Sequence, residues 1–183
     1  MPIFLTRIVA GFIAGALAVL IFHQGAYVLI QYLDANVPAF KQFGNPLQGA
    51  PYRMQPEPLW PELLKALNQP GISVPIIANQ AIWGGLWGIL FAFLLDHIPT
   101  GPTFIRAIVF GLVFPMLLGS WLLVAYVKGR PLFSGAFAKG GFNYVALRNG
   151  FLLNGLAYGV GLGILYPWLA GMMSGRRALP SHA

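Results

Sequence analysis

The stretch IANQAIWGGLWGILFAFLL, residues 77–95, contains no charged side chain. About 20 helical residues cross the hydrocarbon core of a bilayer, so this stretch has the length and composition of a transmembrane helix. It also carries two features that recur along the chain. Polar residues lie near one of its ends (Asn79 and Gln80), and two glycines, Gly84 and Gly88, are four residues apart.

Three other stretches have the same character, at residues 4–33, 104–127 and 149–172. Unpaired backbone groups are too costly in lipid and the alternating pattern of barrel strands is absent, so all four should be helices. We therefore predict an all-α integral membrane protein, a four-transmembrane-helix bundle that forms a single membrane domain over residues 1–183. The alternative for the first stretch is a signal peptide, but its apolar run is too long and no small-residue cleavage site follows.

The overall composition supports the same class. Apolar residues make up 57% of the chain, charged residues only 8%, and the mean hydropathy is +0.71. Soluble domains carry about 25% charged residues, so these few charges could not cover a water-facing surface. The net charge of +7 is best explained by basic residues that face anionic lipid headgroups. No nucleic-acid-binding signature accompanies it.

The first loop, residues 34–76, is long and rich in proline. Within it we predict a short amphipathic helix over about residues 59–68, since Pro61 suits its first turn and Gly71 its end. Five apolar residues share one face at helical spacing: Leu59, Trp60, Leu63, Leu64 and Leu67. Such a helix would lie at the membrane surface. The alternative is an ordinary helix packed on the bundle.

Glycines repeat at four-residue spacing inside three of the four helices. The repeats are Gly11 with Gly15, Gly84 with Gly88, and Gly155 with Gly159 and Gly163. Small residues at this spacing let helix backbones approach closely in lipid. The pattern predicts close helix packing, either within the chain or against another subunit.

Polar residues gather at the helix ends nearest the first and third loops. They form a candidate ligand-binding pocket made of His23, Gln24, Tyr27, Gln31, Asn79, Gln80, Ser120, Arg148, Asn149 and Asn154. A polar stripe inside a membrane span should face the bundle or water. We predict a polar pocket open to this face, with His23 turned inward. The alternative is that these groups only hydrogen-bond one another and hold the helices together.

Several kinds of chemistry have no support in the sequence. The chain has no cysteine, which excludes disulfides and thiolate catalysis. The carboxylates Asp34, Glu57, Glu62 and Asp96 are scattered, without the pairing that acid–base catalysis or a metal site needs. His23 lies near the first loop, whereas His97 lies at the far end of the second helix and His182 in the tail, so they cannot ligate one haem in a simple bundle. We expect no enzyme, no metal and no cofactor; a single axial His23 for haem or chlorophyll stays open.

Short motifs give a resemblance to a known group of proteins. They are Phe22-His23-Gln24, Gly84-Gly85-Leu86-Trp87-Gly88, Lys128-Gly129, and Asn154-Gly155 with Gly159. With these motifs the chain resembles uncharacterised small bacterial inner-membrane proteins with four predicted transmembrane helices. The resemblance implies a multi-pass protein of the bacterial inner membrane and adds no activity.

Three functions are compatible with these features. The first is a non-catalytic accessory or structural subunit that packs in a membrane complex, with other membrane subunits or with itself. The second is a small-molecule or lipid-binding protein, or a passive channel, that uses the polar pocket. The third is a haem- or pigment-binding subunit through His23.

The orientation follows from the basic residues. Arg7, Arg176 and Arg177 favour cytoplasmic N- and C-termini, which we predict. The seven basic residues in the first and third loops, against four on the terminal face, point the other way.

Overall fold

A computed structural model describes residues 3–41, 47, 49–98, 101–133, 137–138, 141–142 and 144–174. It is mostly helical, at 78%. Four helices are long and apolar enough to cross a membrane: Ile3–Asn36, Ile76–His97, Thr103–Val127 and Ala146–Met173. The prediction of four helices long and apolar enough to cross a membrane is confirmed. Arg176, Arg177 and His182, which entered the predictions, lie outside the described residues.

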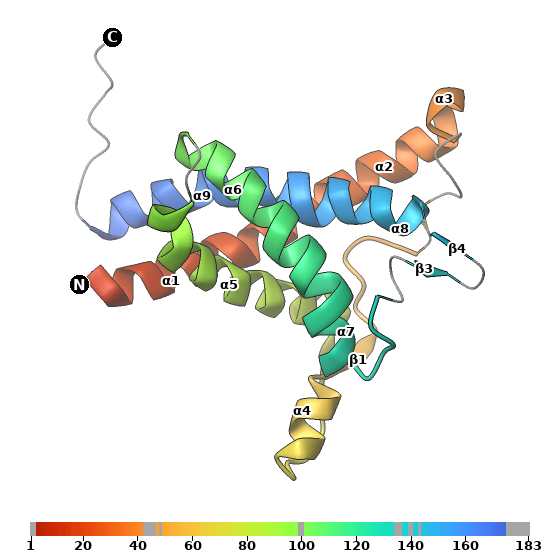
Figure 1. The fold of residues 1–183 in the computed structure, drawn as a ribbon, viewed down its shortest axis with the longest axis horizontal. Coiled ribbons are helices and arrows are strands. Elements are labelled where there is room, and N and C mark those ends of the chain that lie inside the picture. The colour runs from red at the N-terminus through yellow and green to blue at the C-terminus, as the bar shows by residue number, and fades with distance from the viewer. Residues whose placement is uncertain are drawn as a thin grey trace.

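Each of the four spans is built from several helical segments. The first comprises α1 (Ile3–Leu17), η1 (Ala18–His23) and α2 (Gln24–Asn36), followed by the short α3 (Pro38–Lys41). The second comprises α5 (Ile76–Leu94) and the turn η2 (Leu95–His97). The third comprises α6 (Thr103–Gly111), η3 (Leu112–Leu123) and α7 (Val124–Val127). The fourth comprises α8 (Tyr144–Asn149), η4 (Gly150–Ala157) and α9 (Tyr158–Met173). In Figure 1 the first and fourth spans run side by side along the long axis.

The glycine repeats are the points of closest approach between spans. α1 packs against α5, and α6 packs against α9. A Cβ atom added to Gly11 would lie 2.6 Å from the carbonyl oxygen of Gly88, and one added to Gly159 would lie 2.7 Å from Cα of Ile108. Real Cβ atoms do not approach backbone so closely, so only glycine fits here. The predicted close packing is confirmed, and it lies within the chain.

The main hydrophobic core occupies the half of the bundle on the side of the chain termini, which we call the terminal-side half (α1, residues 84–94 of α5, α6 and α9). Phe91 packs edge-on against Phe110 and Tyr166, with ring centroids 5.2 and 5.6 Å apart. The Tyr158 hydroxyl donates to the carbonyl oxygen of Gly84 at 2.8 Å. Most of this core is alanine, aromatic or leucine, and its members in η1 lie at the boundary with the other half. The core comprises Ala10, Ala14, Ala18, Val19, Phe91, Ala92, Ala107, Phe110, Tyr158, Leu162, Tyr166 and Leu169.

The opposite half, towards the first and third loops, is called the loop-side half (η1, α2, residues 76–83 of α5, η3, α7, α8 and η4). Three of the four spans contain π-helical segments here, η1, η3 and η4. Pro115 lies inside η3 and has no N–H for the helical ladder. π-helical turns are rare in proteins, and those that occur are often at functional sites. The loop-side half is therefore the better candidate for a functional site.

The first loop differs from the all-α prediction. Strands β1 (Pro56–Leu59) and β2 (Ile72–Pro75) pair antiparallel, with Pro56 opposite Pro75. The helix predicted over residues 59–68 is the shorter α4 (Pro61–Ala66) at the tip of this hairpin, and Leu59 belongs to the strand. The left-handed backbone of Trp60, with φ of 49°, makes the turn between strand and helix. A second pair joins β3 (Phe137–Ala138) to β4 (Gly141–Phe142).

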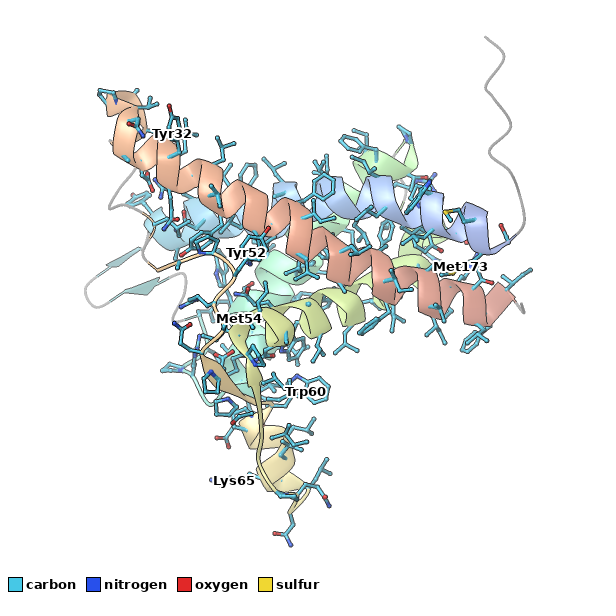
Figure 2. All side chains as sticks on the ribbon, turned by 180° about the vertical axis from the view of Figure 1, so that it is seen from behind. Tyr32, Tyr52, Met54, Trp60, Lys65 and Met173 are labelled. Atoms are coloured by element: carbon cyan, nitrogen blue, oxygen red, sulfur yellow. The ribbon has the colours of Figure 1, made fainter. Side chains whose placement is uncertain are left out.

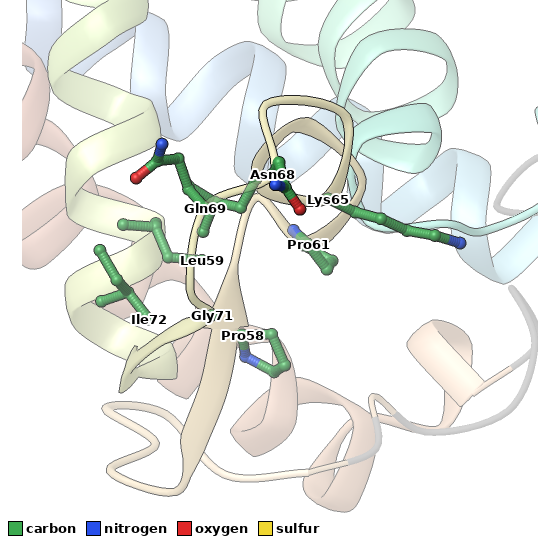
Figure 3. Close-up of a pocket in the computed structure, with 9 residues that line it drawn as sticks. Pro58, Leu59, Pro61, Lys65, Asn68, Gln69, Gly71 and Ile72 are labelled. Carbon is green, nitrogen blue, oxygen red and sulfur yellow. The ribbon is translucent and has the colours of Figure 1, made fainter.

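The β1–α4–β2 hairpin extends away from the bundle (Figure 1). A hollow of about 350 Å³ lies beside α4. Residues of the helix and of both strands line it, among them Leu59, Lys65 and Ile72 (Figure 3). Trp60 ties the hairpin to the second span, because its ring lies edge-on to that of Trp83 with centroids 5.9 Å apart.

Candidate functional site

Gln24 is the centre of a hydrogen-bonded network in the loop-side half. Its side chain is only 2% exposed. Its Nε2 donates to Oε1 of Gln80 at 2.9 Å and lies 3.2 Å from Nδ1 of His23. Its Oε1 accepts the backbone N–H of Tyr52 at 2.9 Å. Both ends of this buried amide are therefore satisfied, as buried polar groups need to be.

His23 extends the network to the third and fourth spans. An amide nitrogen only donates, so Nδ1 of His23 accepts from Gln24 and the ring proton belongs on Nε2. The ring also makes a side-chain hydrogen bond with Asn154. Nδ2 of Asn154 donates to Oγ of Ser120 at 2.9 Å, and that hydroxyl donates to the carbonyl oxygen of Pro115 at 2.9 Å. Side chains from all four spans thus join in one network.

A buried ion pair joins the ends of the first and fourth spans. Arg148 donates to both carboxylate oxygens of Asp34, at 2.9 and 3.2 Å. Asp34 is 2% exposed and Arg148 10%. The backbone N–H of Leu47 donates to the same carboxylate at 2.8 Å, and Nε of Arg148 donates to Oδ1 of Asn149 at 3.1 Å. The guanidinium also lies 5.3 Å from the ring centroid of Phe40, within the range of a cation–π contact.

A second carboxylate, Glu57 of β1, joins the first loop to the second and third spans. It accepts Nδ2 of Asn79 at 2.7 Å, Nζ of Lys128 at 2.8 Å and Nη2 of Arg130 at 3.3 Å. Burial raises the pKa of Glu57, but the bonds and charges of Lys128, Asn79 and Arg130 outweigh it and leave the pKa below its ordinary value. Glu57 is therefore charged at neutral pH, and its ion pairs join the first loop to the third loop. We call this group of contacts the Glu57 clasp.

Three buried polar atoms near this clasp have no hydrogen-bond partner among the described residues. They are Oδ1 of Asn79, Nε1 of Trp60 and Nε1 of Trp83. Most other buried polar side chains of the loop-side half are paired. The junction between the hairpin and the second span is thus the least satisfied polar region in the described part of the chain.

A segment of the first loop, residues 49–55, lies across the network and is called the strap. Nε2 of Gln31 donates to the carbonyl oxygen of Gly49 at 2.7 Å, and the Tyr52 hydroxyl donates to that of Leu20 at 2.9 Å. The carbonyl oxygens of Arg53 and Gln55 accept the first N–H groups of α5, those of Ile77 and Ile76, which a helix start leaves unpaired. Figure 2 shows Tyr52 and Met54 on the stretch between the first span and α5.

The ten predicted pocket residues fall into four groups. His23, Gln24, Gln80, Ser120 and Asn154 share the central network. Arg148 and Asn149 belong to the Asp34 ion pair, with Gln31 linked to it through Leu47. Asn79 belongs to the Glu57 clasp. Tyr27 is buried with Ile30 and Leu153, and its hydroxyl lies against Gly49 of the strap.

Sequence reasoning missed the residues that close these groups. Asp34 looks like an interfacial carboxylate in the sequence, but it follows Gln31 by three residues and so shares its helix face. Glu57 and Tyr52 gave no signal, because their partners lie 22 to 73 residues away.

The chemistry of the site is that of mutual binding between side chains. No group of three or more His, Asp or Glu that could hold a metal occurs in the described part of the chain. Nδ1 of His23 is bonded to Gln24 and the ring also interacts with Asn154, so an axial role toward haem or chlorophyll would require these contacts to be broken. These residues do not fit such a cofactor as they stand.

Comparison with known protein families, curated proteins and solved structures finds no match to this chain. Its function therefore has to be inferred from its own geometry.

Proposed function

We propose that the protein is a non-catalytic integral membrane protein of the bacterial inner membrane, an accessory or structural subunit that packs in a membrane complex. One observation carries this proposal. The polar side chains of the central network bind one another, and Asp34, Glu57 and Asp96 are each in an ion pair. A general acid or base must instead present a free group to a substrate. Polar groups that bind each other act to hold helices together.

The lipid-facing surface contains an apolar groove that suits a partner helix. A groove of about 510 Å³ runs between the first and fourth spans, and its lining is almost wholly apolar. Gly25 lines it, and a Cβ atom there would meet nothing within 4 Å. Small residues on an open helix face allow another helix to approach closely. The partner subunit is therefore expected to seat a transmembrane helix in this groove.

Native mass spectrometry of the protein, extracted in mild detergent, tests the proposal. We expect a co-purifying polypeptide or a second copy of the chain, lost in Gly25→Phe because the ring fills the groove. Gly71→Phe is the matched control, since a Cβ at Gly71 also meets nothing within 4 Å but lies in the first loop. A wild-type protein that never carries another polypeptide would contradict the proposal.

Lipid binding is the second candidate, and the apolar lining of the same groove favours it. In this case the wild-type protein would retain lipid and no polypeptide, and Gly25→Phe would lose the lipid. A small-molecule pocket or passive channel has less support, because the polar side chains are bonded to one another. A haem- or pigment-binding role through His23 predicts visible absorbance of the purified protein.

The finer features of the first loop and of orientation belong to the same proposal. Leu63 and Leu67 are 43% and 58% exposed on the projecting hairpin, which supports an α4 that lies at the membrane surface.

Arg7 supports cytoplasmic termini, and basic residues next to the membrane favour anionic lipid headgroups. A reporter fused to the C-terminus should read as cytoplasmic, and a periplasmic signal would reverse the orientation.

A further inference from the structure

The strap covers the polar network without being part of a packed core. Its residues are mostly exposed; Tyr52, for example, is 49% exposed and Met54 is 68% exposed. Beneath it, Gln24 is 2% and Tyr27 8% exposed. Segments with few buried apolar contacts are the ones that open locally at low cost in free energy. The strap therefore has the character of a cover and not of a core element.

Hydrogen bonds hold the strap to the first span. Two of them use side chains that make no side-chain bond to the central network: Gln31 donates to the carbonyl oxygen of Gly49, and the Tyr52 hydroxyl donates to that of Leu20. The carbonyl of Leu20 belongs to the π-helical segment η1, where the regular helical ladder is disturbed. One further bond runs from the backbone of Tyr52 to Gln24.

The strap is also held in an unfavourable backbone conformation. Tyr52 has φ of 49°, a left-handed value that is rare for a bulky residue. Gly49 has φ of 97°, which favours glycine. Strain of this kind persists only where surrounding contacts impose it, and it is typical of switches and clamps. Release of the anchors would relieve the strain at Tyr52.

We propose that the strap (residues 49–55) is a removable lid, and that its release opens the polar groups of the first span, around Gln24 and Tyr27, to water and small hydrogen-bonding solutes from the loop side. The terminal-side half keeps its glycine-packed helices together during this opening. The inference holds whether or not the chain is an accessory subunit, because it concerns only the contacts between the first loop and the first span.

Cysteine labelling tests this directly, because the chain has no native cysteine. The probe is Tyr27→Cys in the purified full chain, treated with a charged maleimide. The double substitution Gln31→Leu with Tyr52→Phe removes the two side-chain hydrogen bonds that anchor the strap to the first span and leaves Gln24, His23 and Asn154 unchanged. Since each of the two strap bonds shifts the opening equilibrium by about fivefold, labelling at position 27 should become about 25-fold faster.

Matched variants decide the interpretation. Gln69→Leu with Tyr126→Phe makes the same two chemical changes elsewhere, at an exposed glutamine and at a tyrosine that is 68% exposed, and should leave the rate unchanged. Ala107→Cys, 0% exposed in the terminal-side core, should stay unlabelled in every background. The proposal is overturned if the anchor variant labels no faster at position 27, or if Ala107→Cys accelerates by the same factor, which would indicate general loosening.

Discussion

The two halves of this bundle are held together by different forces. In the terminal-side half, backbones meet at glycines and a continuous core of alanine and aromatic side chains fills the space. In the loop-side half, the buried apolar clusters are small, Tyr27 with Ile30 and Leu153, and Met116 with Trp121. Hydrogen bonds and two carboxylate clasps connect the spans there instead.

The difference follows from the bilayer as a solvent. Lipid gives no hydrophobic drive for helices to associate, so close packing and polar contacts must do so. Glycine contacts are short-ranged and tolerate no added atom. Hydrogen bonds can be exchanged for bonds to water, which makes the loop-side half the part that can open. Both halves hold the helices together, but only the loop-side half is suited to local opening.

Loss of one partner of the buried ion pair should have the largest effect. Arg148→Leu leaves the carboxylate of Asp34 buried and unpaired, which should cost about 3–5 kcal/mol in the free energy of unfolding. Asp34→Leu together with Arg148→Leu should recover most of that loss. Thermal unfolding in detergent measures both, and equal losses in the single and double variants would contradict the pairing.

The ion pair of the terminal-side half is the comparison for this prediction. Arg7 and Asp96 are 2.9 Å apart, but their side chains are 36% and 62% exposed. Exposed pairs contribute about 0–1 kcal/mol. Arg7→Leu should therefore shift thermal unfolding far less than Arg148→Leu does.

Added volume should separate packed glycines from open ones. Gly11→Leu places side-chain atoms against the backbone of Gly88 and should cost about 1–3 kcal/mol or prevent accumulation. Gly25→Leu enters open space and should stay within about 0.5 kcal/mol of wild type. Equal melting of the two variants would refute the packing.

Acid should weaken the Glu57 clasp. The pKa of Glu57 is lowered in the folded protein from its ordinary value of 4.5. Its stabilisation is therefore fully present above that value and is lost as pH falls through the lower, folded-state pKa. Glu57→Gln should reduce the drop in melting temperature between neutral and acidic pH. An undiminished drop would show that Lys128 and Arg130 do not stabilise the charged form.

The smallest expected effect is at His23. His23→Leu removes hydrogen bonds worth about 0.6 kcal/mol each in a membrane interior, and it also removes the cost of burying the imidazole. The melting temperature should change little. A loss as large as that of Arg148→Leu would mean that His23, and not the ion pair, organises the loop-side half.

The sequence predicted the parts of the fold that depend on local pattern. Apolar runs located the four spans, and glycine spacing identified the close contacts. The span ends were less accurate, because Asp34 and Arg148 look like loop residues until they are paired. The π-helical segments and the strands around α4 were missed, since strand pairing of Glu57 with Val74 is non-local and the first loop is rich in proline.

The site was predicted in kind but not in detail. Polarity and depth selected His23, Gln24 and Asn154, because a buried polar group in lipid needs a partner. Which partner each group has depends on how the spans are rotated and on the path of the first loop. The residue types at positions 52 and 57 do not indicate that their partners lie tens of residues away. Yet Tyr52 bonds to Gln24 and Glu57 bonds to Asn79.

Backbone hydrogen exchange of the purified full chain tests the contrast between the two halves most directly. Amides of α1, α6 and α9 should exchange slowly, while those of the strap, η3 and η4 in the same detergent should exchange markedly faster, since their half opens locally. Exchange that is equally slow in both halves, or faster in the glycine-packed helices, would contradict this account.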